Sequence, residues 1–507
     1  MAGLRACVIG AGAGGLAAAI ELAAAGVETT VLERHPNPGG KMRQVRVDGT
    51  KSPQETAAVI DAGPTVFTMP SVFEALFARG GQDFFQAVPT VPADILARHA
   101  WTSGGVLDLH AEVSASGAAI RTFAGADEAR RFEAFCSRAA DMYKTLDHSF
   151  MSAQQPSMFE LVRRVGLKGL RGLLRTTPHR SMWSSLGSYF HDPRLRQLFG
   201  RYATYVGSSP LAAPATLMLI AHVEQQGVWL LPGGMRSLAN AMTELGQSLG
   251  VQYRFDAHVE SIEVDPLGRV KGLTIGDEHI AADFVVFAGD HAALAQGKLG
   301  NDVRHAVAPV PRARRGLSAV TWCVHGRTHG FPLHYHNVFF ADDYPGEFDA
   351  IFKRRTQPAE PTVYVCAQDR LHGAAVDGDE RLLILVNAPP DGDIDQWSTG
   401  QQTRVWRAAE DVMARCGLTL SHTADATLAT TPADFEQLFP ATGGSLYGRT
   451  SHGMMASFNR PGARSKVSGL YLAGGTVHPG PGVPMATLSG RLAAEAALSD
   501  CHSRGQP

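Results

Sequence analysis

Three glycines and one acid near the start of the chain have the types and spacing that hold a dinucleotide. Gly10, Gly12 and Gly15 form a G-x-G-x-x-G pattern, and Glu33 lies further along the chain, at the distance of a ribose-binding acid. In such a pattern the first glycine permits a tight turn, the second lets the pyrophosphate approach bare backbone, and the third lets a helix pack close to a sheet. A carboxylate at this distance holds ribose hydroxyls. These residues predict a dinucleotide-binding site.

The elements that must position these residues are a strand, a helix and a second strand. Apolar residues run over 4–9, a helix is expected from the glycine turn to Ala25, and a second strand over 27–32 ends beside Glu33. Gly26 stands where a left-handed C-cap belongs. One face of the helix is apolar and should pack on the sheet: Leu16, Ala19, Leu22 and Ala23. Its N-terminus points unpaired N–H groups and the positive end of its dipole at the phosphates.

The loop after Glu33 supplies backbone access and positive charge. It reads Glu33-Arg34-His35-Pro36-Asn37-Pro38-Gly39-Gly40-Lys41-Met42-Arg43. Its glycines leave the backbone accessible to a ligand, and Lys41 or Arg43 supplies a positive charge that can bind phosphate. The loop resembles that of the FAD-containing amine oxidases and carotenoid desaturases, in which it wraps the pyrophosphate and the flavin. The resemblance implies non-covalent FAD as the cofactor, with Arg34, Gly40, Lys41 and Met42 among its binding residues.

A second motif near the C-terminal end resembles the carotenoid-desaturase form of the flavin segment. Residues 469–476 predict a strand that runs into a glycine turn, and Gly482 opens a helix expected to reach Leu498. The motif itself is Thr476-Val477-His478-Pro479-Gly480-Pro481-Gly482-Val483-Pro484. The resemblance implies that this helix points its N-terminus at the pyrimidine edge of the flavin, where the dipole stabilises negative charge. It also implies flavin contacts from Gly475, Pro484 and Met485, and an adenine contact from the backbone of Val259.

The resemblance and the strand pattern together indicate an α/β protein: a Rossmann-like FAD-binding domain of the amine oxidase/phytoene desaturase type with an inserted α+β substrate domain. We expect the discontinuous FAD domain over 1–69, 226–309 and 441–507, and the substrate domain over 70–225 and 310–440. Within the insertion, residues 70–221 read as mainly helical. Strands are expected over 258–264 and 270–275, and the tail from Ser499 should be frayed.

Composition excludes some classes of function. The formal net charge of the 507 residues is −2, which gives no indication of a nucleic-acid partner. The six cysteines are scattered without zinc-type or C-x-x-C spacing, so reduced thiols in the cytosol are expected. The longest apolar run, around 215–221, is too short to span a bilayer.

Three further segments resemble the hydroxycarotenoid desaturases of purple bacteria, the hydroxyneurosporene or methoxyneurosporene dehydrogenases. They are residues 61–69, which include an Asp-x-Gly-Pro turn that runs beside the flavin in the family, 202–225 and 333–370. A polar insertion near Lys51 departs from the pattern. The resemblance implies that FAD oxidises the C3–C4 bond of an acyclic 1-hydroxycarotenoid, with hydride transfer to flavin N5 followed by proton loss. Because the polyene spreads the positive charge, positioning and water exclusion should dominate, and no catalytic side chain is assigned.

Three alternatives stay open. One is another carotenoid reaction, such as phytoene desaturation or terminal-methyl oxidation. Another is oxidation of a soluble amine, against which the Thr-x-His-Pro-Gly pattern argues. The last is non-enzymatic binding of an isoprenoid partner by a protein of similar fold, against which the intact Gly-Gly-Lys loop argues.

The histidines of the third segment are candidate substrate contacts. His334 and His336 lie two apart, so on a strand both face the side of Val338 and Phe340. They could be ordinary structural histidines, a metal pair or donors to a substrate hydroxyl. No third ligand is evident at a suitable spacing, so no metal is predicted. We expect His334, His336 and Asn337 to recognise the hydroxyl.

A membrane-resident carotenoid requires contact with a membrane surface. Residues 158–175 offer an interfacial helix with a basic stripe of Arg164, Lys168, Arg171 and Arg175, although such a helix could equally pack on the core. The expected location is cytoplasmic, with peripheral association at the inner membrane. The terminal electron acceptor stays open.

Overall fold

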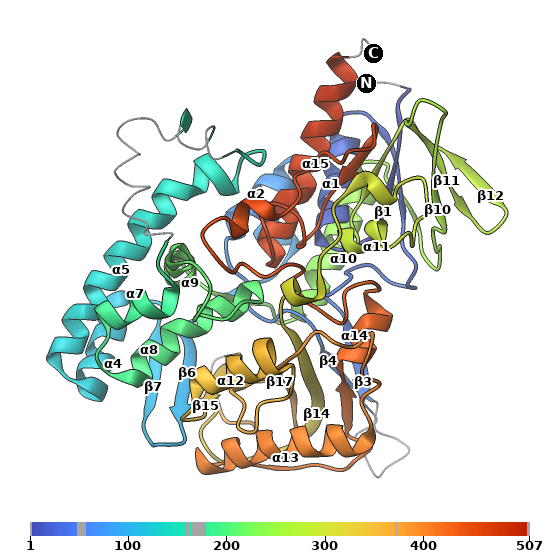
Figure 1. Ribbon diagram of the computed structural model, residues 1–507. Coiled ribbons are helices and arrows are strands. Elements are labelled where there is room, and N and C mark those ends of the chain that lie inside the picture. Colours follow the sequence, from blue (N-terminus) through green and yellow to red (C-terminus); the bar gives the residue numbers. More distant parts are fainter. Residues whose placement is uncertain are drawn as a thin grey trace.

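Two large sheets organise the computed structural model, which describes residues 3–47, 57–157, 160, 163–164, 179–371 and 373–503 (Figure 1). The polar insertion near Lys51 lies outside the described residues, as does nearly all of the segment 158–175. Among the helices that the structure describes, none combines the length and apolar character needed to cross a membrane. The architecture is the expected α/β one.

The first sheet has five strands, and every neighbouring pair is parallel. In spatial order its strands are Leu470–Leu472 (β20), Phe284–Phe287 (β13), Arg5–Ile9 (β1), Glu28–Leu32 (β2) and Gln252–Arg254 (β9). The chain therefore brings its N-terminal, middle and C-terminal parts together in one sheet. The carboxyl ends of parallel strands lie at one edge, where ligands bind in open α/β sheets.

Both faces of this sheet are covered, which explains why β1 is apolar along most of its length. Ala6 and Val8 of β1 face a layer of helices, whereas Cys7 and Ile9 face a small antiparallel sheet. The helices are Ala13–Ala24 (α1), Gly234–Ser248 (α10) and Val483–Ser503 (α15). The small sheet has the strands Ser261–Val264 (β10), Val270–Ile275 (β11) and Glu278–Ala281 (β12), and it projects from the body in Figure 1.

Helix α1 differs from the amphipathic helix that the sequence predicted. Every residue from Gly14 to Leu22 is buried, because α15 packs along the side that we expected to face solvent (Figure 1). Gly14 and Gly490 permit this packing, since a Cβ on Gly490 of α15 would lie 2.2 Å from the carbonyl oxygen of Gly14. The predicted left-handed cap is present, with φ +81° at Gly26.

The C-terminal helix is longer than predicted. It continues to Ser503, with Cys501 buried and Asp500 paired with Arg464, so the residues from Ser499 to Ser503 are helical rather than frayed. The predicted strand over 258–264 starts three residues later, at Ser261, because residues 257–259 form part of a cavity wall instead.

The second sheet is mixed and lies below the first in Figure 1. In spatial order its strands are Leu418–Ser421 (β18), Ser318–Gly330 (β14), Glu380–Ala388 (β17), Val363–Ala367 (β16), His336–Phe340 (β15), Ile95–Trp101 (β6) and Val106–His110 (β7), with Thr427–Thr430 (β19) also paired to β14. The described residues of 70–221 are mainly helical, as predicted, but strands β6 and β7 within this segment were not expected. Their short alternating segments are fixed by pairing β6 with β15, far away in the sequence.

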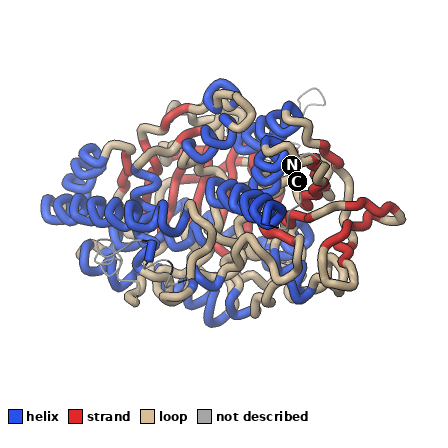
Figure 2. The backbone as a smooth tube through the Cα atoms, turned by 90° about the horizontal axis from the view of Figure 1, so that it is seen from above, coloured by secondary structure: helices blue, strands red, loops and turns tan. Residues whose placement is uncertain are grey.

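Helices cover one face of the second sheet and flank its far end (Figures 1 and 2). Thr399–Arg415 (α13) packs on the face that carries Val320, Ile384 and Val386. The opposite face carries Val338 and Leu383 and packs with a helical group: Val113–Ala124 (α4), Ala126–Leu146 (α5), Met182–Tyr189 (α7), Pro193–Gly200 (α8) and Leu219–Gln225 (α9). The structure also contains a hairpin of Gln44–Val47 (β3) and Ala58–Asp61 (β4) and the short helices Pro70–Ala78 (α2), Tyr344–Phe348 (α12) and Pro432–Leu438 (α14).

Candidate functional site

A cavity of about 700 Å³ lies between the carboxyl edge of the parallel sheet and the face of the mixed sheet that carries Val338 and Leu383. Its wall includes residues from every chain segment singled out for cofactor binding. All of those residues except Gly15 line it: Gly10, Gly12, Glu33, Arg34, Gly40, Lys41, Met42, Val259, Gly475, Pro484 and Met485. The structure thus brings together residues from both ends and the middle of the sequence.

The glycine turn leaves open space where a phosphate group would lie. A Cβ at Gly12 would have no atom within 4 Å, and Gly12 lies at the N-cap of α1 without a side-chain cap. Gly10 has φ +101°, a value that favours glycine. Gly15 lies behind the wall, where a Cβ would stand 1.9 Å from the Gly10 carbonyl oxygen. The backbone cradle and the helix N-terminus suit an anion.

Glu33 is buried at the end of β2 and already organises the turn. Its carboxylate accepts hydrogen bonds from the backbone N–H of Ala11 at 2.7 Å and of His35 at 3.0 Å. Because each carboxylate oxygen has more than one lone pair, these bonds leave acceptor capacity for ribose hydroxyls. Arg34 donates to the carbonyl oxygens of Gln437 and Leu438, so it connects the loop that follows Glu33 to the end of α14.

Lys41 places an ammonium group in the wall of the cavity. It donates to the carbonyl oxygen of Leu446 and lies 5.2 Å from the ring centroid of Phe439. Burial lowers its pKa, with the charge of Asp290 opposing that effect. Arg43, the other candidate cation, donates instead to Thr430 and stands over the ring of Phe435. Lys41 is therefore the better placed of the two for a phosphate, although Arg43 also touches the cavity.

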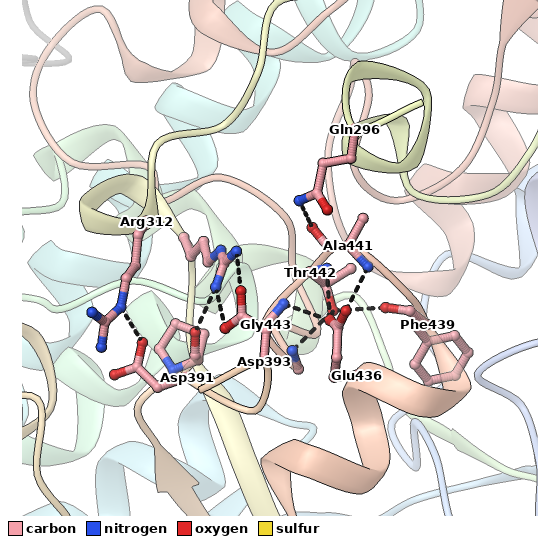
Figure 3. A network of polar contacts seen from close by, with 12 residues as sticks. Gln296, Arg312, Asp391, Asp393, Glu436, Phe439, Ala441, Thr442 and Gly443 are labelled. Carbon is pink, nitrogen blue, oxygen red and sulfur yellow. Dashed lines mark hydrogen bonds and ion pairs between the residues drawn. The ribbon is translucent and has the colours of Figure 1, made fainter. Parts of the chain in front are cut away.

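A loop after α14 closes the cavity beside Lys41, and Glu436 holds it. The Glu436 carboxylate accepts from the backbone N–H groups of Ala441, Thr442 and Gly443 at 2.7–2.9 Å (Figure 3). Arginine–aspartate pairs support the loop from the other side, among them Arg312 with Asp391 at 2.8 Å. The sequence did not indicate this role of Glu436, because a glutamate in a polar segment does not reveal which backbone N–H groups its carboxylate accepts from.

The C-terminal glycine segment forms a second part of the cofactor-binding wall, in addition to the loop that follows Glu33. Gly475 and the residues at the start of α15 line the cavity there, and Arg460 lies directly behind them, buried. Its guanidinium donates to the carbonyl oxygens of Tyr447, Arg449 and Gly475. Burial lowers the pKa of Arg460 to about 10. A buried cation and a helix N-terminus on this wall both favour negative charge in a ligand. No sequence motif pointed to Arg460.

The part of the cavity wall that lies across from the predicted cofactor-binding residues is mostly apolar. It is formed by side chains of the mixed sheet and the helical group, among them Leu146, Phe150, Leu217, Leu219, Ile220, Val223, Val338, Leu383 and Leu385. A wall of this kind fits a hydrocarbon. Arg201 and Glu224, with Tyr205 between them, form a charged group in this wall, and Thr65, Thr321, Tyr364 and Asn387 are further polar residues there.

The histidine segment does not reach the cavity in the way that we expected. His334, His336 and Asn337 are absent from its described wall. Asn337 accepts from the His334 N–H and donates to the His334 and Val365 carbonyl oxygens, so its amide supports the backbone. His334 precedes β15 and is only partly buried. His336 does share the face of Val338, but its Nδ1 lies 2.7 Å from the Tyr364 hydroxyl, and it is Tyr364 that lines the cavity.

The chemistry of the described wall fits FAD. Open space at Gly12, the start of α1 and the ammonium of Lys41 suit a pyrophosphate; Glu33 suits a ribose; and the extended residues 257–259, next to Ala293, suit an adenine. Among the described residues, no group of three or more His, Cys, Asp or Glu side chains could hold a metal ion.

Comparisons with known proteins agree with this geometry. The family model described as flavin-containing amine oxidoreductase matches residues 13–498. The hydroxyneurosporene desaturases of Rubrivivax gelatinosus and Cereibacter sphaeroides are 48% and 42% identical, each over 98% of this chain and over 94% and 98% of their own lengths. A 1-hydroxycarotenoid 3,4-desaturase of a Flavobacterium species is 27% identical over 97% of this chain and 98% of its own length. A solved putrescine oxidase shares the fold at 15% identity, with a TM-score of 0.58 over 98% of this chain and 99% of its own.

Proposed function

We propose a function from one premise: the chain belongs to the flavin-containing amine oxidoreductase family and, within it, to the carotenoid desaturases. It is an FAD-dependent oxidoreductase. We infer that it desaturates a carotenoid in carotenoid biosynthesis and that its substrate is an acyclic 1-hydroxycarotenoid, oxidised at the C3–C4 bond. The names of the relatives just described support this substrate over phytoene, and the complete dinucleotide cradle argues against a non-enzymatic isoprenoid-binding role.

One observation carries the proposal. A single cavity has a backbone cradle for a dinucleotide on one side and an apolar wall on the other. A flavin held by the cradle therefore faces a surface that suits a polyene. An amine substrate would need a more polar wall, or an aromatic cage around the flavin, to bind its charged nitrogen.

FAD, when bound, supplies the hydride acceptor for this reaction. The side chains of the chain orient the polyene and exclude water from it, with Leu383 and Leu385 of β17 forming one side and Ile220 and Val223 of α9 another. The substrate loses a hydride and a proton, and its conjugated system spreads the charge that develops between the two events. No side chain is assigned as the acceptor of the proton.

We further propose which parts of the chain bind FAD. The predicted residues that line the cavity contact the cofactor: Gly10, Gly12, Glu33, Arg34, Gly40, Lys41, Met42, Val259, Gly475, Pro484 and Met485. The division into an FAD domain over 1–69, 226–309 and 441–507 and a substrate domain over 70–225 and 310–440 is part of this proposal. It is supported by the membership of β1, β13 and β20 in the parallel sheet and of β6, β14 and β17 in the mixed one.

We also infer peripheral contact with a membrane, because the substrate is a hydrocarbon that resides there. Exposed Met454 and Met455 offer one apolar contact, with 47% and 42% of their surfaces accessible. Cosedimentation with anionic liposomes tests this. Replacement of both methionines by serine should weaken binding, and unchanged binding would reject their role.

The test of the reaction uses FAD-loaded protein in liposomes. It is incubated with 1-hydroxyneurosporene and separately with phytoene, while the visible spectrum and the product mass are followed. The proposal predicts loss of two hydrogens and a red shift for the hydroxylated carotenoid only. Activity on phytoene alone would move the enzyme to an earlier desaturation, and bound flavin with neither activity would refute the carotenoid assignment.

A further inference from the structure

A buried polar cluster interrupts the apolar wall of the cavity. Arg201 and Tyr205 lie in a short 3-10 helix, Arg201–Val206, that continues α8, and Glu224 lies in α9. The Tyr205 hydroxyl donates to one carboxylate oxygen of Glu224 at 2.6 Å, and Tyr202 donates to the other at 2.6 Å. The Arg201 guanidinium donates to the Tyr205 hydroxyl at 2.8 Å. Within the described residues no direct ion pair joins Arg201 to Glu224, so Tyr205 links the two charges.

Arg201 has more donors than its described neighbours satisfy. Its side chain is almost fully buried, at 7% exposed, and its guanidinium carries five N–H groups. It makes one hydrogen bond to a described acceptor, and its Nε is buried without a partner among the described residues. The rings of Tyr205 and Tyr202, at 5.0 and 5.6 Å, face its charge but accept no conventional hydrogen bond. Nε has almost no accessible surface, so the remaining Nη N–H groups of Arg201 are the ones that can donate to an oxygen of a ligand in the cavity.

Glu224 complements Arg201 as an acceptor. Each of its carboxylate oxygens receives one phenol, which leaves a further lone pair on each. Glu224 is 4% exposed and lines the same cavity as Arg201 and Tyr205. The cavity therefore presents a donor and an acceptor side by side in a mostly apolar wall. A ligand that matches this wall is a hydrocarbon with one hydroxyl group.

A second chain of hydrogen bonds lies next to the cluster. Thr65 and His336 both contact the Tyr364 hydroxyl, at 2.6 and 2.7 Å. Burial and the nearby charge of Arg201 lower the pKa of His336 to about 3, so the imidazole is neutral. Tyr364 thus has both of its hydrogen-bonding partners within the protein. Nε2 of His336 has no described partner, but His336 does not line the cavity, whereas Arg201 and Glu224 do.

We propose that Arg201, Tyr205 and Glu224 form the subsite that binds the terminal oxygen of the carotenoid. Arg201 donates a hydrogen bond to this oxygen, and Glu224 accepts one from the hydroxyl group. Tyr205, which is hydrogen-bonded to both side chains, keeps them in position. This inference rests on the proposed carotenoid substrate. It also separates two substrates that differ by a methyl group, since a methoxy oxygen accepts from Arg201 but donates nothing to Glu224.

The subsite also explains which carbon–carbon bond reacts. The hydroxyl oxygen on C1 is four bonds from C4, which limits their separation to roughly 5 Å. Binding of the oxygen therefore fixes the C3–C4 bond close to the cluster. Thr65, in contact with Tyr364, follows the Asp-x-Gly-Pro turn that the family resemblance puts beside the flavin. By binding the polar end of the substrate, the cluster sets which carbon–carbon bond is placed beside the flavin.

The test measures binding separately from turnover. Quenching of tryptophan fluorescence in detergent micelles gives the affinities of FAD-loaded protein for 1-hydroxyneurosporene, its methoxy analogue and neurosporene. The variants are Arg201→Met, Glu224→Gln and Tyr205→Phe. Matched controls are Arg196→Met, on the preceding turn and stacked on Trp183, and Tyr189→Phe; neither residue lines the cavity.

We expect wild-type protein to prefer the hydroxylated carotenoid over neurosporene. Arg201→Met should reduce this preference by about 10- to 100-fold, and Glu224→Gln should reduce the preference for hydroxy over methoxy by about tenfold. Should Arg201→Met not fold, the nearly isosteric Glu224→Gln decides. Equal wild-type affinities, or preferences within twofold of wild type in the folded variants, would overturn the subsite. Preferential binding without loss of two hydrogens would instead overturn the proposed reaction and leave the subsite standing.

Discussion

The two walls of the cavity are built from different parts of the polypeptide. The cofactor wall is largely backbone, with glycine turns at Gly10–Gly12 and Gly39–Gly40 and the first turns of α1 and α15. The substrate wall is formed by side chains, with leucine, isoleucine and valine around the cluster of Arg201, Tyr205 and Glu224. A backbone wall binds any ligand with phosphates in the right place, whereas a side-chain wall discriminates among ligands.

This difference predicts different sensitivities. Added atoms damage the cofactor wall where backbone segments approach one another too closely to admit a Cβ, as at Gly15 and Gly39. The substrate wall should tolerate changes of shape between apolar residues and respond instead to a change in polarity or charge. Each of the following experiments tests one side of this contrast.

The largest effect is expected from Gly15→Ala. The new Cβ would stand 1.9 Å from the Gly10 carbonyl oxygen, so α1 must move away from the sheet. We expect a loss of about 3 kcal/mol or more in the free energy of unfolding and protein purified without flavin, measured by denaturation and by flavin absorbance. Gly117→Ala in α4 is the control, because its Cβ would meet only Glu133 Oε1, at 3.8 Å. A yellow, stable Gly15→Ala protein would show that the close approach is not needed.

Glu436→Ala tests the loop that closes the cofactor wall. Three backbone N–H groups lose their acceptor, so the free energy of unfolding should fall by about 3 kcal/mol and FAD should bind more weakly. Denaturation and flavin titration measure the two effects. The exposed Glu244→Ala in α10 should change neither. A loss of stability with unchanged FAD affinity would separate this loop from cofactor binding.

Lys41→Met removes one charge from the cofactor wall. We expect FAD affinity to fall by about 10- to 100-fold, measured by titration of the apoprotein, with Lys144→Met on the surface of α5 as the control. Because burial lowers the pKa of Lys41, wild-type affinity should fall as the pH rises through that lowered value. Identical pH profiles for wild type and Lys41→Met would remove Lys41 from the phosphate site.

The smallest effect concerns His336 behind the substrate wall. Burial, with Arg201 nearby, lowers its pKa to about 3, so below pH 6.5 the unfolded chain binds a proton that the folded one does not. Stability is therefore lost as the pH falls below 6.5, and this residue contributes at most about 2 kcal/mol of that loss between pH 6.5 and 5. His336→Gln should flatten the slope between pH 6.5 and 5 in urea denaturation, whereas exposed His329→Gln should not. An unchanged slope would mean that His336 is protonated in the fold.

The sequence predicted the cofactor wall far better than the substrate wall, and the contrast in construction explains why. The cradle is specified by short-range motifs, so Gly10, Glu33, Lys41 and Pro484 could be found from spacing alone or by resemblance. The polar cluster depends on how the 3-10 helix Arg201–Val206 packs against α9, and Arg201 and Glu224 look like ordinary helical charges in the sequence. Strand β6 was missed for a similar reason: its partner β15 lies more than two hundred residues away.

The most direct test of the account is an anaerobic single turnover. FAD-loaded protein is mixed with one equivalent of 1-hydroxyneurosporene without any external electron acceptor, and flavin absorbance and product mass are followed together. The account predicts that the flavin bleaches as the carotenoid loses two hydrogens, in a one-to-one ratio. A flavin that stays oxidised while the carotenoid is bound would contradict the claim that this cavity joins a flavin to a carotenoid for desaturation.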